Sequence, residues 1–351
     1  MPPPPDCMST SGKTRVAVIG GGAFGRNHAR VYRELAQAGE AELCGVVDVN
    51  LTRAEAVGRE FGTRAFSSIE DLLRNEAPAA ASVAVPTIEH LAVARDLMQA
   101  GVDVLIEKPL AASVAEADEL IRFASRHRRI VQVGHLERFN PAVRATLPLV
   151  TQPMFFEVHR LSVFTPRSLD VDVVLDLMIH DLDIVLALVK SPVKEIRAVG
   201  LPILSEKVDI ANVRLEFESG CIANFTASRV STEKVRKLRF FQPHQYISVD
   251  YTRQDVLVFN VESSPAPAPG AMQEIFLSEA AATATPGISV SRPQIHPQEP
   301  LKAELRAFLE AVRNRTTPVV TVEDGRRALA AAHQILAQIA GHARRLGLSA
   351  P

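Results

Sequence analysis

The pattern of apolar and polar positions divides the chain into two regions. Up to about residue 134, short continuous apolar runs alternate with stretches in which apolar residues recur with helical spacing. Continuous apolar runs are typical of parallel strands that are buried on both faces. The predicted strands are 15–20, 41–47, 64–66, 80–85, 102–106 and 129–133. Strands that alternate with helices predict an α/β Rossmann domain, a doubly wound parallel sheet with right-handed crossovers.

Beyond residue 151, apolar positions alternate with polar ones, as they do in strands with one buried face. The predicted strands are 155–161, 196–203, 209–218, 221–229, 237–242, 245–251 and 255–260. Successive strands joined by short turns predict an α+β domain with a large, mostly antiparallel open sheet. Helices must cover one face of this sheet, and the other can pair with a second subunit. We therefore expect a homo-oligomer, either a dimer or a tetramer.

The same patterns predict the domain boundaries: a disordered tail over 1–14, an NAD-binding Rossmann domain over 15–134, and a substrate and oligomerisation domain over 135–345. Residues 263–300 are rich in Pro, Ala and Ser and lack periodicity, so they predict a long loop. Two helical patterns follow, over 300–315 and 322–345.

Composition narrows the classes of partner. Lys and Arg together number 39 and Asp and Glu 40, for a formal net charge of -1. No overall positive field therefore attracts nucleic acid or an anionic membrane. The three cysteines Cys7, Cys44 and Cys221 are far apart and show no spacing typical of a metal site. The N-terminus lacks the apolar segment of a secretory signal. We predict a cytoplasmic protein with free thiols and no metal.

A glycine-rich turn follows the first strand. Gly20, Gly22 and Gly25 have the spacing G-x-G-x-x-G, with Ala23 and Phe24 before the third glycine. In a dinucleotide-binding turn the first glycine permits the tight turn, the second lets backbone approach a pyrophosphate, and the third lets the helix pack on the strand. The phosphates then lie at the helix N-terminus. We expect this stretch to bind a dinucleotide, while glycines alone also suit an ordinary tight turn.

Polar residues follow the next strands. Asp48 ends the second strand about 20 residues after the glycine turn, where an acidic residue accepts the adenosine ribose hydroxyls and repels a 2′-phosphate. This favours NAD over NADP; the alternative is that Asp48 caps a helix from about Thr52. Thr87 and His90 follow the fourth strand, and we expect both near the nicotinamide half of the cofactor. The alternative for His90 is a solvent-facing residue in the first helical turn.

The sequence Glu107-Lys108-Pro109 follows the apolar run 102–106. Ligands of open α/β sheets bind beyond the carboxyl ends of the strands. We therefore predict that Lys108 stands where chemistry takes place and that Glu107 and Lys108 contact the cofactor. Pro109 fixes its own φ and favours extended geometry at Lys108. Taken alone, the motif also suits a solvated lysine beside a turn proline.

An apolar stretch over 172–186 contains Asp176, His180 and Asp183 with the spacing i, i+4, i+7. In an α-helix this spacing puts the three side chains on one face. Charged groups amid apolar helix surface are costly unless they are paired. A His with a carboxylate one turn away is an oriented acid–base pair. We predict function for Asp176 and His180 and a structural role for Asp183.

The junction between the two regions predicts a further helix start. Asn140 is the expected N-cap and Pro141 the first helical residue. We also expect Asn140 to contact substrate. For Arg138 two roles are open, a structural inter-domain ion pair and a contact with substrate.

Four motifs resemble the glucose–fructose oxidoreductase / inositol dehydrogenase / MocA family: Gly20–Gly25 after a strand, Glu107-Lys108-Pro109, Gly134–Pro141 and Asp176-x-x-x-His180. The resemblance covers about residues 14–345. It implies NAD as the cofactor and an active site lined by Lys108, Asp176 and His180, the expected catalytic residues. It also implies that the Lys108–Pro109 bond is cis.

Within that family, Val133–Pro141 and Leu175–Asp183 are most similar to the UDP-N-acetylglucosamine 3-dehydrogenases. The resemblance therefore implies NAD-dependent oxidation of the C3 hydroxyl of a UDP-N-acetylhexosamine to a 3-keto sugar nucleotide. Arginine offers bidentate geometry to phosphate. Arg160 and Arg167 are thus candidates to clamp the diphosphate, with surface solvation as the alternative.

The expected reaction transfers the C3 hydride to nicotinamide and the hydroxyl proton to His180, oriented by Asp176. Lys108 and His180 contact the same oxygen, and Lys108 stabilises the developing alkoxide; which of the two is the formal base is left open. Other open substrates are a cyclic polyol, a free sugar and UDP-N-acetylglucosaminuronic acid. In another class, a non-catalytic NAD(H) or sugar-nucleotide sensor is possible, but a sensor has no need of a proton acceptor.

Overall fold

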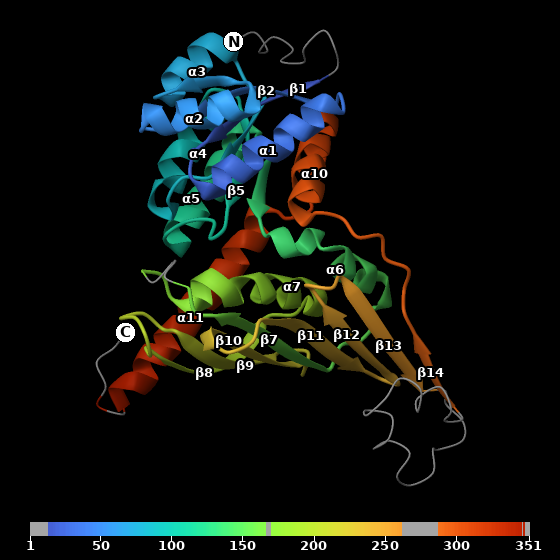
Figure 1. The fold of residues 1–351 in the computed structure, drawn as a ribbon. Helices are drawn as coiled ribbons and strands as arrows, with labels where there is room; N and C mark the ends of the chain where they lie inside the picture. Colours follow the sequence, from blue (N-terminus) through green and yellow to red (C-terminus); the bar gives the residue numbers. More distant parts are fainter. Residues whose placement is uncertain (1–12, 166–169, 262–286, 346, 348–351) are drawn as a thin grey trace. The chain divides into compact units, whose positions relative to one another are not determined.

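The computed structural model describes residues 13–165, 170–261, 287–345 and 347 (Figure 1). The chain divides into two compact units. The first takes in the chain up to Phe139 together with Glu299–Ala330, and the second takes in Asn140–Gln298 and the chain from Ala331. The predicted tail lies outside the described residues as far as residue 12, and so do residues 263–286 of the predicted loop.

The first unit is built on a six-stranded parallel sheet with the order β3-β2-β1-β4-β5-β6. Its strands are β1 (Thr14–Ile19), β2 (Ala41–Val47), β3 (Arg64–Phe66), β4 (Ala80–Val83), β5 (Asp103–Glu107) and β6 (Val131–Gly134). The order reverses between β1 and β4, and open α/β sheets bind ligands beyond the carboxyl ends of strands at such a point. The predicted Rossmann fold is confirmed.

The helices that connect these strands are α1 (Ala23–Gln37), α2 (Leu51–Phe61), α3 (Ile69–Glu76), α4 (His90–Gln99) and α5 (Val114–His127). Asn50, Ser68 and Ser113 start α2, α3 and α5 by accepting a backbone N–H of the first turn. Helix α10 (Pro300–Asn314) packs Leu305 and Phe308 into one core with α1, β1 and β2. The first unit thus includes a helix that the sequence pattern placed with the second domain.

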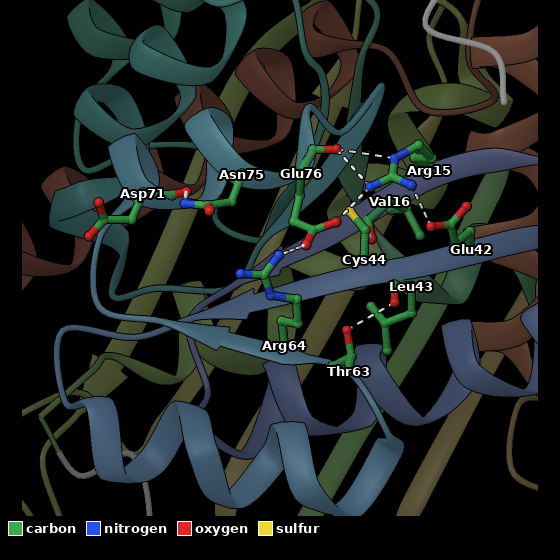
Figure 2. Close-up of polar contacts among 10 residues, drawn as sticks. All are labelled: Arg15, Val16, Glu42, Leu43, Cys44, Thr63, Arg64, Asp71, Asn75 and Glu76. Atoms are coloured by element: carbon green, nitrogen blue, oxygen red, sulfur yellow. Dashed lines mark hydrogen bonds and ion pairs between the residues drawn. The ribbon is translucent and has the colours of Figure 1, made fainter.

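An ion-pair network ties together the amino ends of the strands (Figure 2). Arg15 of β1 donates to the backbone carbonyl and the carboxylate of Glu76 at the end of α3, and it also pairs with Glu42 of β2. Arg64 of β3 donates to the same Glu76 carboxylate at 2.6 Å. Nearby, burial raises the pKa of the Cys44 thiol to about 12. These contacts lie at the opposite end of the strands from the carboxyl edge.

The second unit is built on an eight-stranded sheet with the order β14-β13-β12-β11-β7-β10-β9-β8. Its strands are β7 (Phe155–Val163), β8 (Val193–Leu201), β9 (Ile210–Phe217), β10 (Ile222–Ser231), β11 (Val235–Gln242), β12 (Gln245–Asp250), β13 (Asp255–Val261) and β14 (Ile288–Ser291). Neighbours are antiparallel except β7 and β10. The predicted mostly antiparallel sheet is confirmed. The predicted loop is wrong at β14, where the apolar alternation is too short to stand out from its Pro-rich surroundings.

The two faces of this sheet differ. One face is buried and includes Phe156 and Phe240, whose ring centroids lie 5.4 Å apart. Helices α6 (Pro141–Thr146) and α7 (Ile179–Val189) run along one side of the sheet (Figure 1). The other face carries a row of half-buried aromatic rings on neighbouring strands, Phe155, Phe241, Tyr246 and Phe259. This arrangement follows from the two-residue period of strands.

Helix α11 (Val322–Arg345) belongs to the first unit as far as Ala330 and to the second from Ala331. Ile339 of α11 packs against Gly200 of β8, where a Cβ would lie 2.9 Å from Ile339 Cδ1. Glycine at this position therefore allows close packing of the helix on the strand. Among the described helices, none is both long and apolar enough to cross a membrane.

Candidate active site

The turn between β1 and α1 has a geometry that suits close approach of a dinucleotide. Gly20 has a φ of +101°, and a Cβ there would lie 2.5 Å from the carbonyl oxygen of Ala84. A Cβ on Gly25 would lie 1.7 Å from the carbonyl oxygen of Gly20, so α1 can pack here only on a glycine. At Gly22, no described atom beyond its own neighbours in the chain lies within 4 Å of the Cβ position. That side of the turn is open, which fits the pyrophosphate of NAD.

Helix α1 begins at this turn without a side-chain cap. Backbone N–H groups of its first turn can therefore donate to phosphate oxygens, and the helix dipole favours the negative charge. Ala23 and Phe24 are exposed in the same turn, Phe24 at 62%. Their contact with the cofactor stays a prediction, but nothing in the described turn covers them.

Asp48 follows β2 and lies beside the glycine turn. Its carboxylate accepts the backbone N–H groups of Gly21 and Asn50, each at 2.8 Å, and Arg53 lies 3.4 Å from it. The alternative role of Asp48 as a helix cap is wrong, because Asn50 caps α2. A carboxylate held at this position fits the ribose hydroxyls of NAD and disfavours a 2′-phosphate.

Thr87 and His90 follow β4. Thr87 begins a short 3-10 helix (η1, Thr87–Glu89) and is half-buried, and its contact with the nicotinamide half stays a prediction. His90 is 1% exposed rather than solvent-facing, and its ring nitrogens lie 3.1 Å from the carbonyl oxygens of Val85 and Pro109. Burial lowers the pKa of His90. Because the backbone engages both sides of this ring, the geometry does not support the predicted cofactor contact.

Glu107 is the last residue of β5, and the Lys108–Pro109 bond is cis, as the resemblance implied. The Glu107 carboxylate lies 2.8 Å from Nε2 of His28 and accepts the backbone N–H of Lys108 at 3.2 Å. Burial acts to raise the pKa of Glu107, but His28 and Lys108 together hold it below its usual value. Since the strands are parallel, this segment lies at the same sheet edge as the glycine turn and Asp48.

Arg138 and Asn140 have structural contacts. Arg138 lies 3.8 Å from the carboxylate of Asp324, which favours an ion pair over a substrate contact; both residues belong to the first unit, so the predicted inter-domain character of this pair is wrong. The predicted N-cap is confirmed, because Asn140 accepts the N–H of Ala142 at 3.0 Å. Its amide also donates to the carbonyl oxygen of Tyr251 at 3.0 Å, and the residue is 2% exposed. This geometry does not support the predicted substrate contact of Asn140.

In the second unit, Asp176 and His180 lie on either side of a change in helix type. Asp176 lies in a π-helical turn (η4, Val174–Met178), and His180 lies in the first turn of α7. A regular α-helix was expected here, and π turns are frequent at functional sites. Both side chains are half-buried, whereas Asp183 is 2% exposed. Exposure thus separates the two candidate catalytic residues from the residue with a predicted structural role.

Arg160 is a correction to the predicted diphosphate clamp. Its side chain is 3% exposed and makes two hydrogen bonds to the Asp181 carboxylate, at 2.6 and 2.9 Å. The guanidinium carbon also lies 5.1 Å from the centroid of the Tyr251 ring. An arginine engaged in this way belongs to the core, and the geometry does not support a role in binding diphosphate. Arg167, the other predicted clamp, lies outside the described residues.

His28, Asp181 and Glu304 are among the buried polar residues that the sequence analysis missed. His28 contacts Glu107, and Asp181 contacts Arg160. Glu304 of α10 is 0% exposed, and burial together with the charge of Glu107 raises its pKa well above the usual value. For His28 a signal was present, because it shares a face of α1 with the buried Tyr32 and Leu35.

Comparison with known proteins follows the division into units. Residues 14–135 match the GFO/IDH/MocA oxidoreductase family with an NAD-binding Rossmann fold, and residues 152–247 match the GFO/IDH/MocA C-terminal domain. A UDP-N-acetylglucosamine 3-dehydrogenase of Acidithiobacillus ferrooxidans is 36% identical over 322 residues, which are 92% of this chain and 96% of that protein. An inositol 2-dehydrogenase of Acidothermus cellulolyticus is 30% identical over 55% of this chain and 58% of its own length.

A solved structure of the Acidithiobacillus ferrooxidans UDP-N-acetylglucosamine 3-dehydrogenase superposes with a TM-score of 0.83 at 35% identity, covering 93% of this chain and 97% of that one. The similarity thus extends over both units and not only over the nucleotide-binding half. Together with the glycine turn, Asp48 and the Glu107-Lys108-Pro109 strand end, it shows that the chain belongs to the GFO/IDH/MocA family of NAD-dependent oxidoreductases.

Proposed function

We propose that this protein oxidises the C3 hydroxyl of UDP-N-acetylglucosamine to a 3-keto sugar nucleotide, with NAD as the hydride acceptor. The observation that carries the proposal is the extent of similarity to the Acidithiobacillus ferrooxidans UDP-N-acetylglucosamine 3-dehydrogenase, which covers 92% of this chain. This match includes the second unit, which carries Asp176 and His180, so it supports a similar substrate as well as a similar cofactor. The match to the Acidothermus inositol 2-dehydrogenase covers only 55% of the chain.

In this proposal the residues of the chain manage the proton and the developing charge. His180 accepts the hydroxyl proton, and Asp176 orients its imidazole. Lys108 donates hydrogen bonds to the reacting oxygen and stabilises the negative charge that develops on it. The glycine turn holds the pyrophosphate, and Asp48 holds the adenosine ribose. Bound NAD supplies the acceptor for the C3 hydride.

A substrate screen tests the proposal. NADH formation at 340 nm is measured with UDP-N-acetylglucosamine, its uronic acid and myo-inositol, and the products are analysed by mass spectrometry. We expect NADH formation with UDP-N-acetylglucosamine and a product two mass units lighter, the ketone. Turnover of myo-inositol but not of UDP-sugars would instead support the polyol alternative, which the 30% identity to an inositol 2-dehydrogenase favours.

Substitution of the proposed catalytic residues tests their roles. Lys108→Met and His180→Asn should each lower kcat about 10²-fold or more, because general acid–base catalysis contributes about 10²–10⁴-fold. Their affinity for NAD, measured by calorimetry, should stay close to that of the wild type. Lys234→Met and His296→Asn are matched controls at exposed positions. Wild-type turnover in Lys108→Met or His180→Asn would remove that residue from the mechanism.

We further propose that two copies of the chain pair through the sheet face that carries Phe155, Phe241, Tyr246 and Phe259. Their successive ring centroids lie 5.6, 4.9 and 5.4 Å apart, so the rings form a continuous row across four strands. These rings are half-buried, and apolar surface left partly uncovered on one sheet face is typical of an interface. Light scattering coupled to size exclusion should give an oligomer at micromolar concentration, and a monomer would contradict the proposal.

A cytoplasmic location completes the proposal. Cys44 and Cys221 are both buried free thiols rather than partners in a disulfide, as is usual in reducing compartments. Fractionation of the source cells with an antibody to this chain should recover it with the cytoplasmic proteins.

A further inference from the structure

His28 of α1 is a buried imidazole with one side-chain partner in the part of the chain that the structure describes. It is 1% exposed, and its Nε2 lies 2.8 Å from Oε1 of Glu107. Its Nδ1 is also buried and has no hydrogen-bond partner among the described residues. Burying a polar group costs free energy unless the group makes a hydrogen bond. The contact with Glu107 is therefore the one that fixes the ring.

The Glu107 carboxylate reaches in two directions from the end of β5. One oxygen faces His28, and the other accepts the backbone N–H of Lys108 at 3.2 Å. Gly134 of the neighbouring strand β6 makes room for this carboxylate. A Cβ at Gly134 would lie 3.1 Å from the Cα, Cδ and Oε2 of Glu107. A side chain at position 134 would therefore press on the carboxylate that His28 and Lys108 share.

The charge states determine the direction of these hydrogen bonds. The pKa of Glu107 is held below its usual value against the effect of burial. An ionised carboxylate only accepts hydrogen bonds, so Nε2 of His28 must carry a hydrogen and donate it. Hydrogen bonds to an ionised acceptor are shorter and stronger than neutral ones. The His28–Glu107 bond therefore resists displacement of the strand end.

We propose that His28 is a positioning residue that holds Lys108 in place through Glu107, and so links the helix of the glycine turn to the strand end that carries the reacting ammonium. Gly25 and His28 lie within one turn of the same helix, so cofactor binding at its N-terminus and the position of Lys108 share one rigid element. The inference rests on the role of Lys108 in the proposed function. It assigns His28 no contact with the substrate.

Two substitutions separate positioning from a merely structural role. His28→Leu removes the donor, whereas His28→Gln restores an amide N–H close to the place of Nε2. A misplacement of about 1 Å can lower catalysis about 10²-fold. We expect kcat to fall by up to about 10²-fold in His28→Leu, to recover largely in His28→Gln, and the Kd for NAD to change little in either. Tyr32 lies on the same helix as His28, and Tyr32→Phe, which removes a buried hydrogen bond to Ser82 of β4, serves as the control.

The kcat values of the two His28 variants decide whether His28 positions Lys108. Folded His28→Leu with wild-type kcat, or a His28→Gln variant as impaired as His28→Leu, would overturn the proposal. If His28→Leu does not fold, His28→Gln must retain kcat within a few fold of wild type, and a larger loss also overturns it.

If the wild-type protein does not oxidise UDP-N-acetylglucosamine, the proposed function is wrong, but the positioning role of His28 can still be tested. Positioning is then judged from the NMR signal of ¹³C-dimethylated Lys108, assigned with Lys108→Arg. That signal should move in His28→Leu and return in His28→Gln, and an unmoved signal overturns the inference.

Discussion

Removing Asp181 should destabilise the second unit more than the loss of any exposed ion pair. The Arg160 and Asp181 side chains are 3% and 2% exposed and share two hydrogen bonds of 2.6 and 2.9 Å. Asp181→Ala leaves a guanidinium buried without its main counter-charge. Breaking a buried pair in this way costs about 3–5 kcal/mol. For a unit of this size, each kcal/mol lowers Tm by about 2–4 °C, so we expect a loss of about 6–20 °C.

Circular dichroism at 222 nm is the suitable assay, because the chain contains no Trp to report by fluorescence. Lys194→Met is the matched control. It removes an ion pair of 2.6 Å to Glu216 in the same sheet, where the side chains are 62% and 32% exposed. Exposed pairs contribute about 0–1 kcal/mol. If Asp181→Ala lowers Tm no more than Lys194→Met does, the buried pair does not hold α7 on β7.

The double variant Arg160→Met/Asp181→Leu tests whether the expected loss of stability comes from leaving one charge buried without its partner. Replacing both members of a buried pair by apolar residues is often neutral or stabilising, by about 1–4 kcal/mol. We expect its Tm to return to within a few degrees of wild type. The KM for the sugar nucleotide should also stay within about threefold, since losing one contact worth about 1.4 kcal/mol would raise it tenfold. A much higher KM in a stable double variant would restore Arg160 as a diphosphate clamp.

Three further outcomes follow from the described contacts. Burial and the charge of Glu107 raise the pKa of Glu304 in the folded protein. Protonated Glu304 therefore stabilises the fold fully below the pKa of the unfolded chain, about 4.3, and this stabilisation is lost as the pH rises through the folded pKa. Glu304→Gln should therefore gain stability over wild type between pH 5 and 8 in urea titrations, and parallel curves would contradict this. Asp48→Ser removes the carboxylate and leaves Arg53 at the ribose position. The ratio of kcat/KM with NADP to that with NAD should therefore rise tenfold or more, and an unchanged ratio would show that Asp48 does not select the cofactor. Phe241→Lys should halve the molar mass seen by light scattering or lower it further, and an unchanged mass would place the interface elsewhere.

The sequence predicted the first unit well because its signals are local. A continuous apolar run predicts a parallel strand, and the parallel order then places the ends of β1, β2 and β5 at one edge. Gly25 is required by a backbone contact of 1.7 Å with Gly20 inside the same turn, whereas the 2.5 Å contact that requires Gly20 is with Ala84 at the end of β4. Asp48 and Lys108 could therefore be assigned to the same edge without knowledge of any tertiary contact.

Other features depend on contacts between distant segments, and periodicity does not predict these. The amphipathic pattern of α10 shows that one face is buried, but not that Leu305 and Phe308 pack with α1 and β1 in the first unit. The π turn around Asp176 was not predicted either, because the apolar spacing of this stretch fits a regular α-helix. In the same way, the residues that complete the site are bonded across long separations, as His28 is to Glu107, and no local rule pairs them.

Arg160 shows that the periodic pattern should be applied to charged residues as strictly as to apolar ones. Along β7, Phe156, Val158 and Arg160 lie two positions apart, and therefore on the same face of the sheet. Since Phe156 and Val158 are buried, Arg160 had to be buried too, and a buried guanidinium requires a carboxylate. The pattern alone thus argues against a solvent-facing clamp and predicts a partner. It does not say which carboxylate, because Asp181 lies on a separate helix whose register on the sheet is set by packing.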